Sequence, residues 1–164
     1  MTTPLANIPN SVTVSRDMVY ASVGERDLRL DVYWQKESTE PLPLVVWIHG
    51  GAWRKGDKEN PRALPLLSKD YAVASVEYRL SQEAIFPAQI HDCKSAIRWL
   101  RSNATQFNFD PDRIGVWGGS AGGHLVALLG TSGDVADLEG ELGVTTTSSR
   151  VQAVCDWFGP TDLL

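Results

Sequence analysis

The stretch RIGVWGGSAGGHLVALLG, residues 113–130, decides the fold of this chain. An apolar run typical of a short strand leads into Ser120, and the spacing of the leucines that follow predicts a helix. Gly118, Ser120 and Gly122 form a G-x-S-x-G pattern at this strand-to-helix junction, with Gly119 in its second position. A turn this sharp strains the serine backbone and leaves no room for a side chain at Gly118 or Gly122. The pattern predicts a hydroxyl exposed above the carboxyl edge of a sheet, at the amino end of a helix.

Glycine-rich turns of this kind occur at two types of site. A helix N-terminus favours the negative charge that develops on a substrate oxygen, and it also favours phosphate groups. Dinucleotide-binding turns, however, have the order G-x-G-x-x-G and follow the first strand of their domain. Here the string is GGSAGG, and it follows the fourth or fifth expected strand. The order of the residues therefore favours nucleophilic chemistry at Ser120 over phosphate binding.

The rest of the chain alternates between strand and helix patterns. Strands are expected at 18–22 and 28–34, which form a hairpin. Further strands are expected at 44–48 and 71–80, in the residues just before Gly118, and at 151–160. Helices are expected at 61–69, 87–104 and 120–130. Such alternation predicts an α/β fold, with a mostly parallel sheet and helices on both faces. Residues 1–16 are polar and are expected to form an amino-terminal arm, so that the domain occupies residues 17–164.

Composition and charge exclude several classes of function. The chain has 164 residues, 43% of them hydrophobic, which is enough for one domain with a substantial core. Its net charge of -5 provides no basic face for nucleic acid. Cys93 and Cys155 lie far apart in apolar patterns, so neither a disulfide framework nor a metal site is expected. No apolar run reaches the length of a membrane span and the first residues lack a signal-peptide pattern, so we expect a cytoplasmic protein without membrane contact.

The stretch HGGAW, residues 49–53, is the second motif with chemical meaning. Acyl transfer needs two or three N–H donors fixed around the oxyanion, and glycines let the backbone approach a ligand closely enough to supply them. We expect Gly51 and Ala52 to be the donors on this side and Ala121 to be the donor of the nucleophile turn. His49 is expected to hold the loop by hydrogen bonds.

Four stretches together resemble a known family. They are HGGAW (49–53), EYRL with FPAQIHDCKSAIRWLR (77–101), DPDRIGVWGGSAGGHLVALL (110–129) and DWFGPTDLL (156–164). From about Met18 onward, the chain resembles the amino-terminal part of α/β-hydrolase-fold carboxylesterases, and it is similar to the HGG-motif esterases of the hormone-sensitive-lipase group and to the BD-FAE-like branch. The resemblance implies a serine esterase that hydrolyses short-chain esters of small molecules through an acyl-enzyme, without a cofactor. It implies Ser120 as the nucleophile, with a supporting set of His49, Gly50, Gly118, Gly119 and Gly122.

A serine hydroxyl needs a base that takes its proton and an acid that orients the base. In this fold the chain order is Ser, then Asp or Glu, then His. The chain has three histidines, His49, His91 and His124, and none follows a suitable acid. His124, one helical turn after Ser120, is a candidate base, but the turn is expected to direct the serine oxygen away from the helix axis.

Asp156 and Asp162 are candidate acids because they follow the last expected strand. The resemblance places the acid after a further strand, however, and Asp162 is also suited to cap a short helix that begins at TDLL. We therefore expect the triad acid and histidine to lie outside this chain.

Three aromatic residues, Trp53, Tyr78 and Phe86, have two possible roles. They either line the part of the site that would hold the acyl or alcohol group of a substrate, or they belong to the core.

The expected sheet is also smaller than that of the family. Six strands are expected, whereas the family fold has eight, so the last two strands and their helices are missing. An apolar strand at the edge of a sheet promotes association, so we expect self-association or a complementing chain at this edge. The competing hypothesis is a catalytically incomplete hydrolase fragment that acts as a binding or assembly module.

Overall fold

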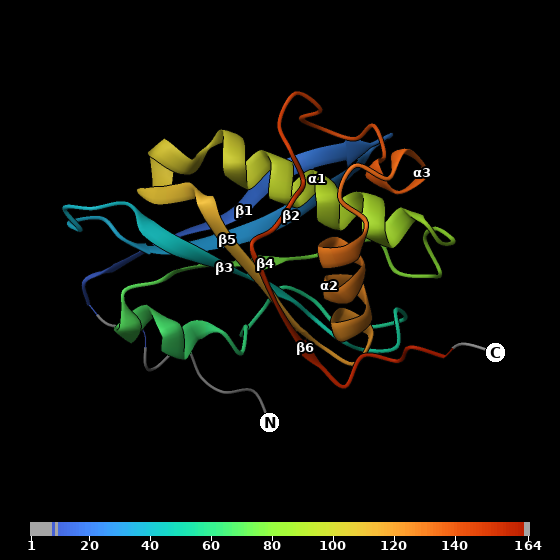
Figure 1. Ribbon diagram of the computed structural model, residues 1–164, viewed down its shortest axis with the longest axis horizontal. Coiled ribbons are helices and arrows are strands. Elements are labelled where there is room, and N and C mark those ends of the chain that lie inside the picture. The colour runs from blue at the N-terminus through green and yellow to red at the C-terminus, as the bar shows by residue number, and fades with distance from the viewer. Residues whose placement is uncertain (1–7, 9, 163–164) are drawn as a thin grey trace.

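The computed structural model describes residues 8 and 10–162, which form one six-stranded sheet with helices packed on it (Figure 1). The strands are β1 (Val12–Val23), β2 (Arg26–Gln35), β3 (Leu42–Ile48), β4 (Ala72–Val76), β5 (Phe109–Gly119) and β6 (Ala153–Trp157). Their order across the sheet is β1-β2-β4-β3-β5-β6. The pairs β1/β2 and β2/β4 are antiparallel, whereas β4/β3, β3/β5 and β5/β6 are parallel. The predicted hairpin and the mostly parallel sheet are therefore confirmed.

Helices cover the two faces of the sheet unequally. The α-helices are α1 (Ala88–Ser102), α2 (Ala121–Thr131) and α3 (Ala136–Glu139), and the 3-10 helices are η1 (Leu64–Lys69) and η2 (Ala104–Phe107). Helices α1 and α2 pack together on one face, with the larger core between them and the sheet. On the other face, η1 packs on β2 and β4 and closes a smaller core. In Figure 1, η1 (green) lies below the sheet and α1 lies above it.

Strand β3 illustrates why these residues form a central strand. Its apolar side chains alternate between the faces, so that Val46 and Ile48 join the larger core and Trp47 joins the smaller one. A strand with apolar residues on both faces has a continuous apolar sequence, as is typical of parallel strands. A helix was expected at 87–104, and the apolar residues that recur there at helical spacing are all buried: Ile90, Cys93, Ile97, Leu100 and Ala104.

The start of the first strand differs from the sequence prediction, and two later strands, β4 and β6, are shorter than the expected 71–80 and 151–160. Strand β1 begins at Val12, so the expected division between an arm (1–16) and a domain (17–164) falls inside a strand. Because β1 is an edge strand with partly exposed side chains, residues 12–16 do not need the apolar pattern of a buried strand. The arm's residues 1–7 and 9 lie outside the described residues.

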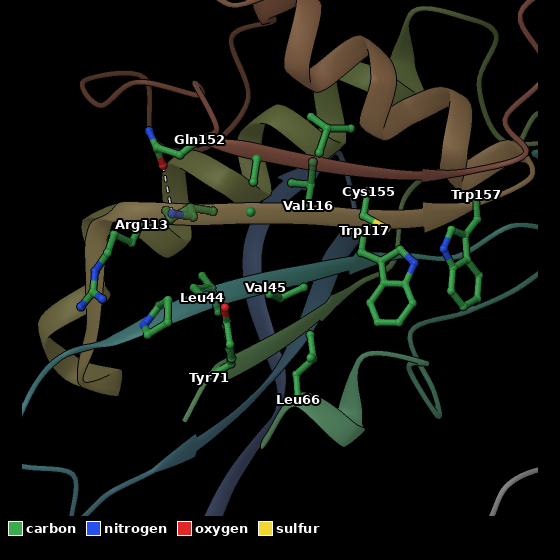
Figure 2. A pocket seen from close by; sticks show the side chains of 15 residues that line it. Leu44, Val45, Leu66, Tyr71, Arg113, Val116, Trp117, Gln152, Cys155 and Trp157 are labelled. Carbon is green, nitrogen blue, oxygen red and sulfur yellow. Dashed lines mark hydrogen bonds between the residues drawn. The ribbon is translucent and has the colours of Figure 1, made fainter. Parts of the chain in front are cut away.

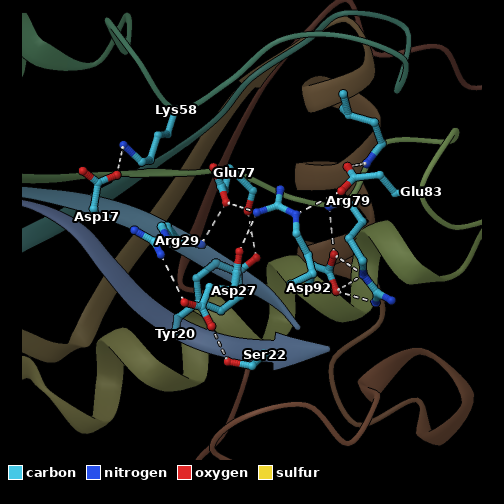
Figure 3. Close-up of polar contacts among 12 residues, drawn as sticks. Asp17, Tyr20, Ser22, Asp27, Arg29, Lys58, Glu77, Arg79, Glu83 and Asp92 are labelled. Atoms are coloured by element: carbon cyan, nitrogen blue, oxygen red, sulfur yellow. Dashed lines mark hydrogen bonds and ion pairs between the residues drawn. The ribbon is translucent and has the colours of Figure 1, made fainter. Parts of the chain in front are cut away.

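An ion pair fastens the segment after β4 to α1 (Figure 3). The guanidinium of Arg79 donates to both carboxylate oxygens of Asp92, at 2.7 Å from Nη2 to Oδ1 and 2.9 Å from Nε to Oδ2. The backbone N–H of Arg79 donates to the same carboxylate at 2.9 Å. Asp92 is fully buried, and these donors satisfy its charge. The segment fixed in this way also contacts the loop after β3, through the Ser81 hydroxyl.

Asp92→Ala should destabilise the fold by about 3–5 kcal/mol, because it leaves the mostly buried Arg79 guanidinium without its counter-charge. Arg150→Ala removes the exposed ion pair between Asp134 and Arg150, so this control should cost less than about 1 kcal/mol. Urea unfolding followed by circular dichroism measures both free energies. Equal losses in the two variants would show that the Arg79 contact does not hold the fold together.

Candidate functional site

The two motifs found in the sequence meet at the carboxyl edge of the sheet. Strands β3 and β5 are parallel neighbours, so the residues that follow them lie close together. Gly50 touches the turn after β5: a Cβ built on Gly50 would lie 2.5 Å from the Gly119 oxygen and 3.4 Å from the Ser120 Cβ. The HGG loop, residues 49–53, is therefore in contact with the turn that carries Ser120.

Ser120 has the strained backbone that the sequence predicted, with φ 56° and ψ -121°. A positive φ is uncommon for a residue with a Cβ, and it persists only where neighbouring groups hold it. The Ser120 N–H donates to the Trp157 carbonyl at 2.8 Å, and the Ser120 carbonyl accepts from the His124 N–H at 3.0 Å. The residue is exposed, and its hydroxyl makes no capping hydrogen bond to α2. The hydroxyl is therefore available to a substrate.

Two glycines make this turn possible. A Cβ on Gly118 would overlap the carbonyl of Gly122, in the first turn of α2. A Cβ on Gly122 would overlap the carbonyl of Ile48 and would lie 2.7 Å from that of His49. The end of β3, the end of β5 and the first turn of α2 are thus in direct backbone contact, which leaves no space for a side chain.

Several backbone N–H groups near Ser120 have no protein acceptor within the described part of the chain, and they include those of the three residues expected to bind an oxyanion. The HGG loop is left-handed at three successive residues, with φ 118° at Gly51, 54° at Ala52 and 57° at Trp53. Residues 54–55 close the loop by donating to the Gly51 carbonyl at 3.0 and 3.2 Å. Among the described residues, the N–H groups of Gly51, Ala52 and Ala121 have no protein acceptor. These are the donors that the sequence predicts for an oxyanion hole.

His49 braces the HGG loop from the inside. Its ring is buried, and burial lowers the pKa of His49, so the imidazole is neutral at pH 7. Its Nδ1 lies 2.7 Å from the Gly50 carbonyl, which can only accept, so Nδ1 carries the proton. The Tyr78 ring stacks on His49 at 4.3 Å, and the Tyr78 hydroxyl donates to the His49 carbonyl at 2.9 Å. Tyr78 is 1% exposed and belongs to the core.

His124 and Asp156 are not assembled as a base and an acid. The His124 ring meets Trp53 edge-on at 5.3 Å, and its buried Nδ1 has no partner in the described part of the chain. No hydrogen bond between described atoms joins the His124 ring to the Ser120 hydroxyl. Burial lowers the pKa of His124, and the charge of Asp156 opposes this only in part. Asp156 itself accepts the Gly159 N–H at 2.8 Å.

The second candidate acid, Asp162, is exposed. The short helix that it was expected to cap includes residues 163–164, which lie outside the described residues. Within residues 8 and 10–162, no three His, Cys, Asp or Glu side chains are grouped in a way that would bind a metal ion. The helices in the same part of the chain are too short or too polar to cross a lipid bilayer.

A cavity of about 290 Å³ opens between the HGG loop and α2, one helical turn beyond Ser120. Its lining consists of Trp53, Ser81, Phe86, Gln89 and His124. The Ser81 hydroxyl donates to the Trp53 carbonyl at 2.8 Å, and the Gln89 amide donates to two backbone carbonyls. Because the protein engages these polar groups, the cavity offers a ligand mainly the aromatic rings and the imidazole.

A larger groove, of about 500 Å³, lies on the face of the sheet that carries η1, along β3, β5 and β6 (Figure 2). Its walls include Val45, Leu66, Tyr71, Trp117, Cys155 and Trp157. Figure 2 shows the two tryptophan rings together at one end of the groove. Neither the HGG loop nor Ser120 contributes to these walls, so the groove is separate from the candidate site at Ser120. It borders β6, the edge strand, whose residues are all exposed.

Sequence reasoning missed the contribution of the residues after β6. DWFGP was expected only as the end of a strand, yet the Trp157 carbonyl binds the Ser120 N–H. A backbone carbonyl has no side-chain signature, so the only available signal was the Gly159–Pro160 pair, which predicts a turn.

Gly122→Ala should disrupt the nucleophile turn, because the new Cβ would overlap a backbone carbonyl. We expect the free energy of unfolding to fall by about 1–3 kcal/mol. In the matched control Gly133→Ala, the Cβ would meet only the flexible Arg150 side chain, at 3.0 Å, so the cost should stay below about 0.5 kcal/mol. Urea unfolding measures both, and a Gly122→Ala variant as stable as the control would contradict the backbone contact.

Comparison with known proteins relates these features to a family. Residues 30–164 match the family model BD-FAE. Esterase LipQ of Mycobacterium tuberculosis is 35% identical over 154 residues, which cover 90% of this chain and 35% of LipQ. The chain spans about a third of the length of the curated relatives that it matches.

Solved structures show the same fold. One is a structure described as a truncated form of a carbohydrate esterase from gut microbiota, with a TM-score of 0.84 and 40% sequence identity. The matched region covers 92% of this chain and 58% of the chain in that structure. Another is Thermogutta terrifontis esterase 2, phosphorylated by paraoxon, with a TM-score of 0.74 and 28% sequence identity. The matched region covers 88% of this chain and 56% of the esterase chain. The α/β-hydrolase fold expected from the sequence is confirmed by these likenesses.

Proposed function

The chain belongs to the BD-FAE family of α/β-hydrolase-fold esterases, and on this premise we propose that it carries the nucleophile and the oxyanion hole of a serine carboxylesterase. Ser120 is the nucleophile, and Gly51, Ala52 and Ala121 donate to the oxyanion. The substrates are esters of short-chain carboxylic acids. The observation that carries the proposal is the strained, exposed Ser120 beside three amide groups without a protein acceptor. The relatives named as esterases support this function over a non-catalytic binding or assembly module.

The reaction proceeds through an acyl-enzyme. The Ser120 oxygen attacks the carbonyl carbon of the ester, its proton passes to a base, and negative charge develops on the carbonyl oxygen. That oxygen accepts hydrogen bonds from the three N–H groups at the amino end of α2 and in the HGG loop, which stabilise its charge. The intermediate collapses as the base returns the proton to the leaving alcohol. Water then hydrolyses the acyl-enzyme in the same way.

The base and the acid come from outside these 164 residues. His49 is buried and braces the HGG loop, and the His91 Nε2 is bonded to the Asp137 carbonyl at 3.0 Å. His124 lies one turn from Ser120 without a hydrogen bond to its hydroxyl. In this fold the missing groups follow the nucleophile on later strands. A second copy or a complementing chain is expected at the β6 edge. It would adjoin the apolar groove. This association remains a prediction.

The cavity beside Ser120 favours uncharged substrates. Its walls are mainly the rings of Trp53, Phe86 and His124, and no charged side chain from the described part of the chain lines it. Transfer of an ionised group into such surroundings is costly, because no counter-charge is present. The cavity therefore suits an uncharged acyl or alcohol group.

An alkyl fluorophosphonate should form one adduct, on Ser120, and Ser120→Ala should abolish it, as read by peptide mass spectrometry. Because no base from the described residues contacts the hydroxyl, the labelling rate should rise about tenfold per pH unit from pH 7 to 9, as hydroxide removes the proton. If His124 were the base, its lowered pKa would keep it neutral throughout this range, so the rate would not change with pH from 7 to 9.

His124→Asn is the matched variant for this prediction, and it should keep the same rise of the labelling rate with pH, because His124 is not the base. Labelling of a residue other than Ser120, or an equal rate of labelling in Ser120→Ala, would contradict the assignment of Ser120.

A further inference from the structure

We propose that Asp156 is a positioning residue for Ser120 and not the acid of a triad. The proposal rests on the proposed role of Ser120 as the nucleophile. It concerns the turn of residues 156–159, which follows β6 and contacts the strained serine. Through this turn, Asp156 acts on Ser120 without touching the substrate.

The Asp156 side chain closes the turn. Its Oδ1 accepts the Gly159 N–H at 2.8 Å. Phe158, between these residues, is left-handed with φ 47°, so the chain reverses direction here. The Trp157 carbonyl lies within the closed turn and accepts the Ser120 N–H at 2.8 Å. Because the Asp156 hydrogen bond fixes the turn, it also fixes the direction of that carbonyl.

The turn lies against the first turn of α2 with no space between the two backbones. A Cβ on Gly159 would lie 2.5 Å from the His124 nitrogen and 2.6 Å from the Gly123 carbonyl carbon. A Cβ on Gly123 would overlap the Asp156 Oδ1 and would lie 2.8 Å from the Gly159 nitrogen. A displacement of the turn would therefore displace the start of the helix that follows Ser120.

These contacts hold Ser120 in the conformation that its reaction requires. A serine with φ 56° relaxes toward ordinary backbone angles unless its neighbours oppose the change. The hydrogen bond to the Trp157 carbonyl opposes it, because a rotated peptide would lose this acceptor. The same bond occupies the Ser120 N–H, which leaves the Ala121 N–H as the donor that this turn offers to a substrate oxygen.

A triad acid and a positioning residue make different demands on residue 156. A triad acid must be charged and must bond to a histidine, and in a known serine protease Asn in its place lowers turnover about 10⁴-fold. Between described residues, Asp156 makes no hydrogen bond to a histidine, and its Oδ1 is occupied by the turn. Closing the turn requires only an acceptor oxygen, which Asn also has. Asp156→Asn therefore separates the two roles.

The test compares Asp156→Asn with Asp156→Ala in the 164-residue chain. One readout is hydrogen exchange of the Ser120 N–H by NMR, and the other is the rate at which an alkyl fluorophosphonate labels Ser120. Asn should keep both rates within about twofold of the parent, whereas Ala should speed exchange and slow labelling by about tenfold, as for one lost hydrogen bond.

Asp110→Ala is the matched control. The Asp110 Oδ1 accepts the Asp112 N–H at 2.8 Å in a similar local turn, at the opposite end of β5 from Ser120. This variant loses the same kind of hydrogen bond, together with the exposed ion pair between Asp110 and Arg113, and it should change neither readout.

Equal damage from Asn and Ala would overturn the proposal, because it would mean that the charge of Asp156 is required. An Ala variant that behaves like the parent would overturn it as well. If Asp156→Ala does not fold, Gly159→Ala takes its place. The new Cβ at residue 159 would displace the turn, while the Asp156 carboxylate would remain. Unchanged exchange and labelling rates in Gly159→Ala would also overturn the proposal. Labelling of a residue other than Ser120 would refute Ser120 as the nucleophile. The exchange rates of the Ser120 N–H would still test whether the turn of residues 156–159 holds residue 120.

Discussion

The whole site depends on one steric constraint, which is the backbone contact between the ends of β3 and β5 and the start of α2. Gly118 and Gly122 lack the Cβ atoms that would keep these segments apart. Their contact requires the chain to change direction between β5 and α2 at a single residue, and Ser120 takes a positive φ as a result. The strain persists because hydrogen bonds and close packing on both sides of Ser120 oppose its relaxation.

The chemistry that this contact allows comes mainly from backbone groups. The loop after β3 brings amides, the turn after β5 brings a hydroxyl and a further amide, and the turn after β6 brings an acceptor for the Ser120 N–H. All three follow neighbouring parallel strands, whose carboxyl ends share one edge of the sheet, where ligands bind in α/β folds. His49 and Asp156 brace these loops through hydrogen bonds to the backbone.

The sequence predicted the features that have a local cause. The glycines around Ser120 indicated the strained turn, and the apolar runs indicated the central strands, because both signals lie within a few residues. The start of β1 at Val12 was missed because an edge strand can be polar. The acceptor at Trp157 was missed because a carbonyl is common to all residues and its partner is 37 positions away in the chain, from 120 to 157. Long-range backbone contacts of this kind need the fold before they become visible.

The most direct test of this account is a crystal structure of the chain after Ser120 has reacted with an alkyl fluorophosphonate. The phosphonyl oxygen of the adduct stands in for the oxyanion of the tetrahedral intermediate. We predict that it lies about 2.7–3.1 Å from the N–H groups of Gly51, Ala52 and Ala121, with φ of Ser120 still positive. A phosphonyl oxygen directed into solvent, or Ser120 in relaxed helical geometry, would contradict the account.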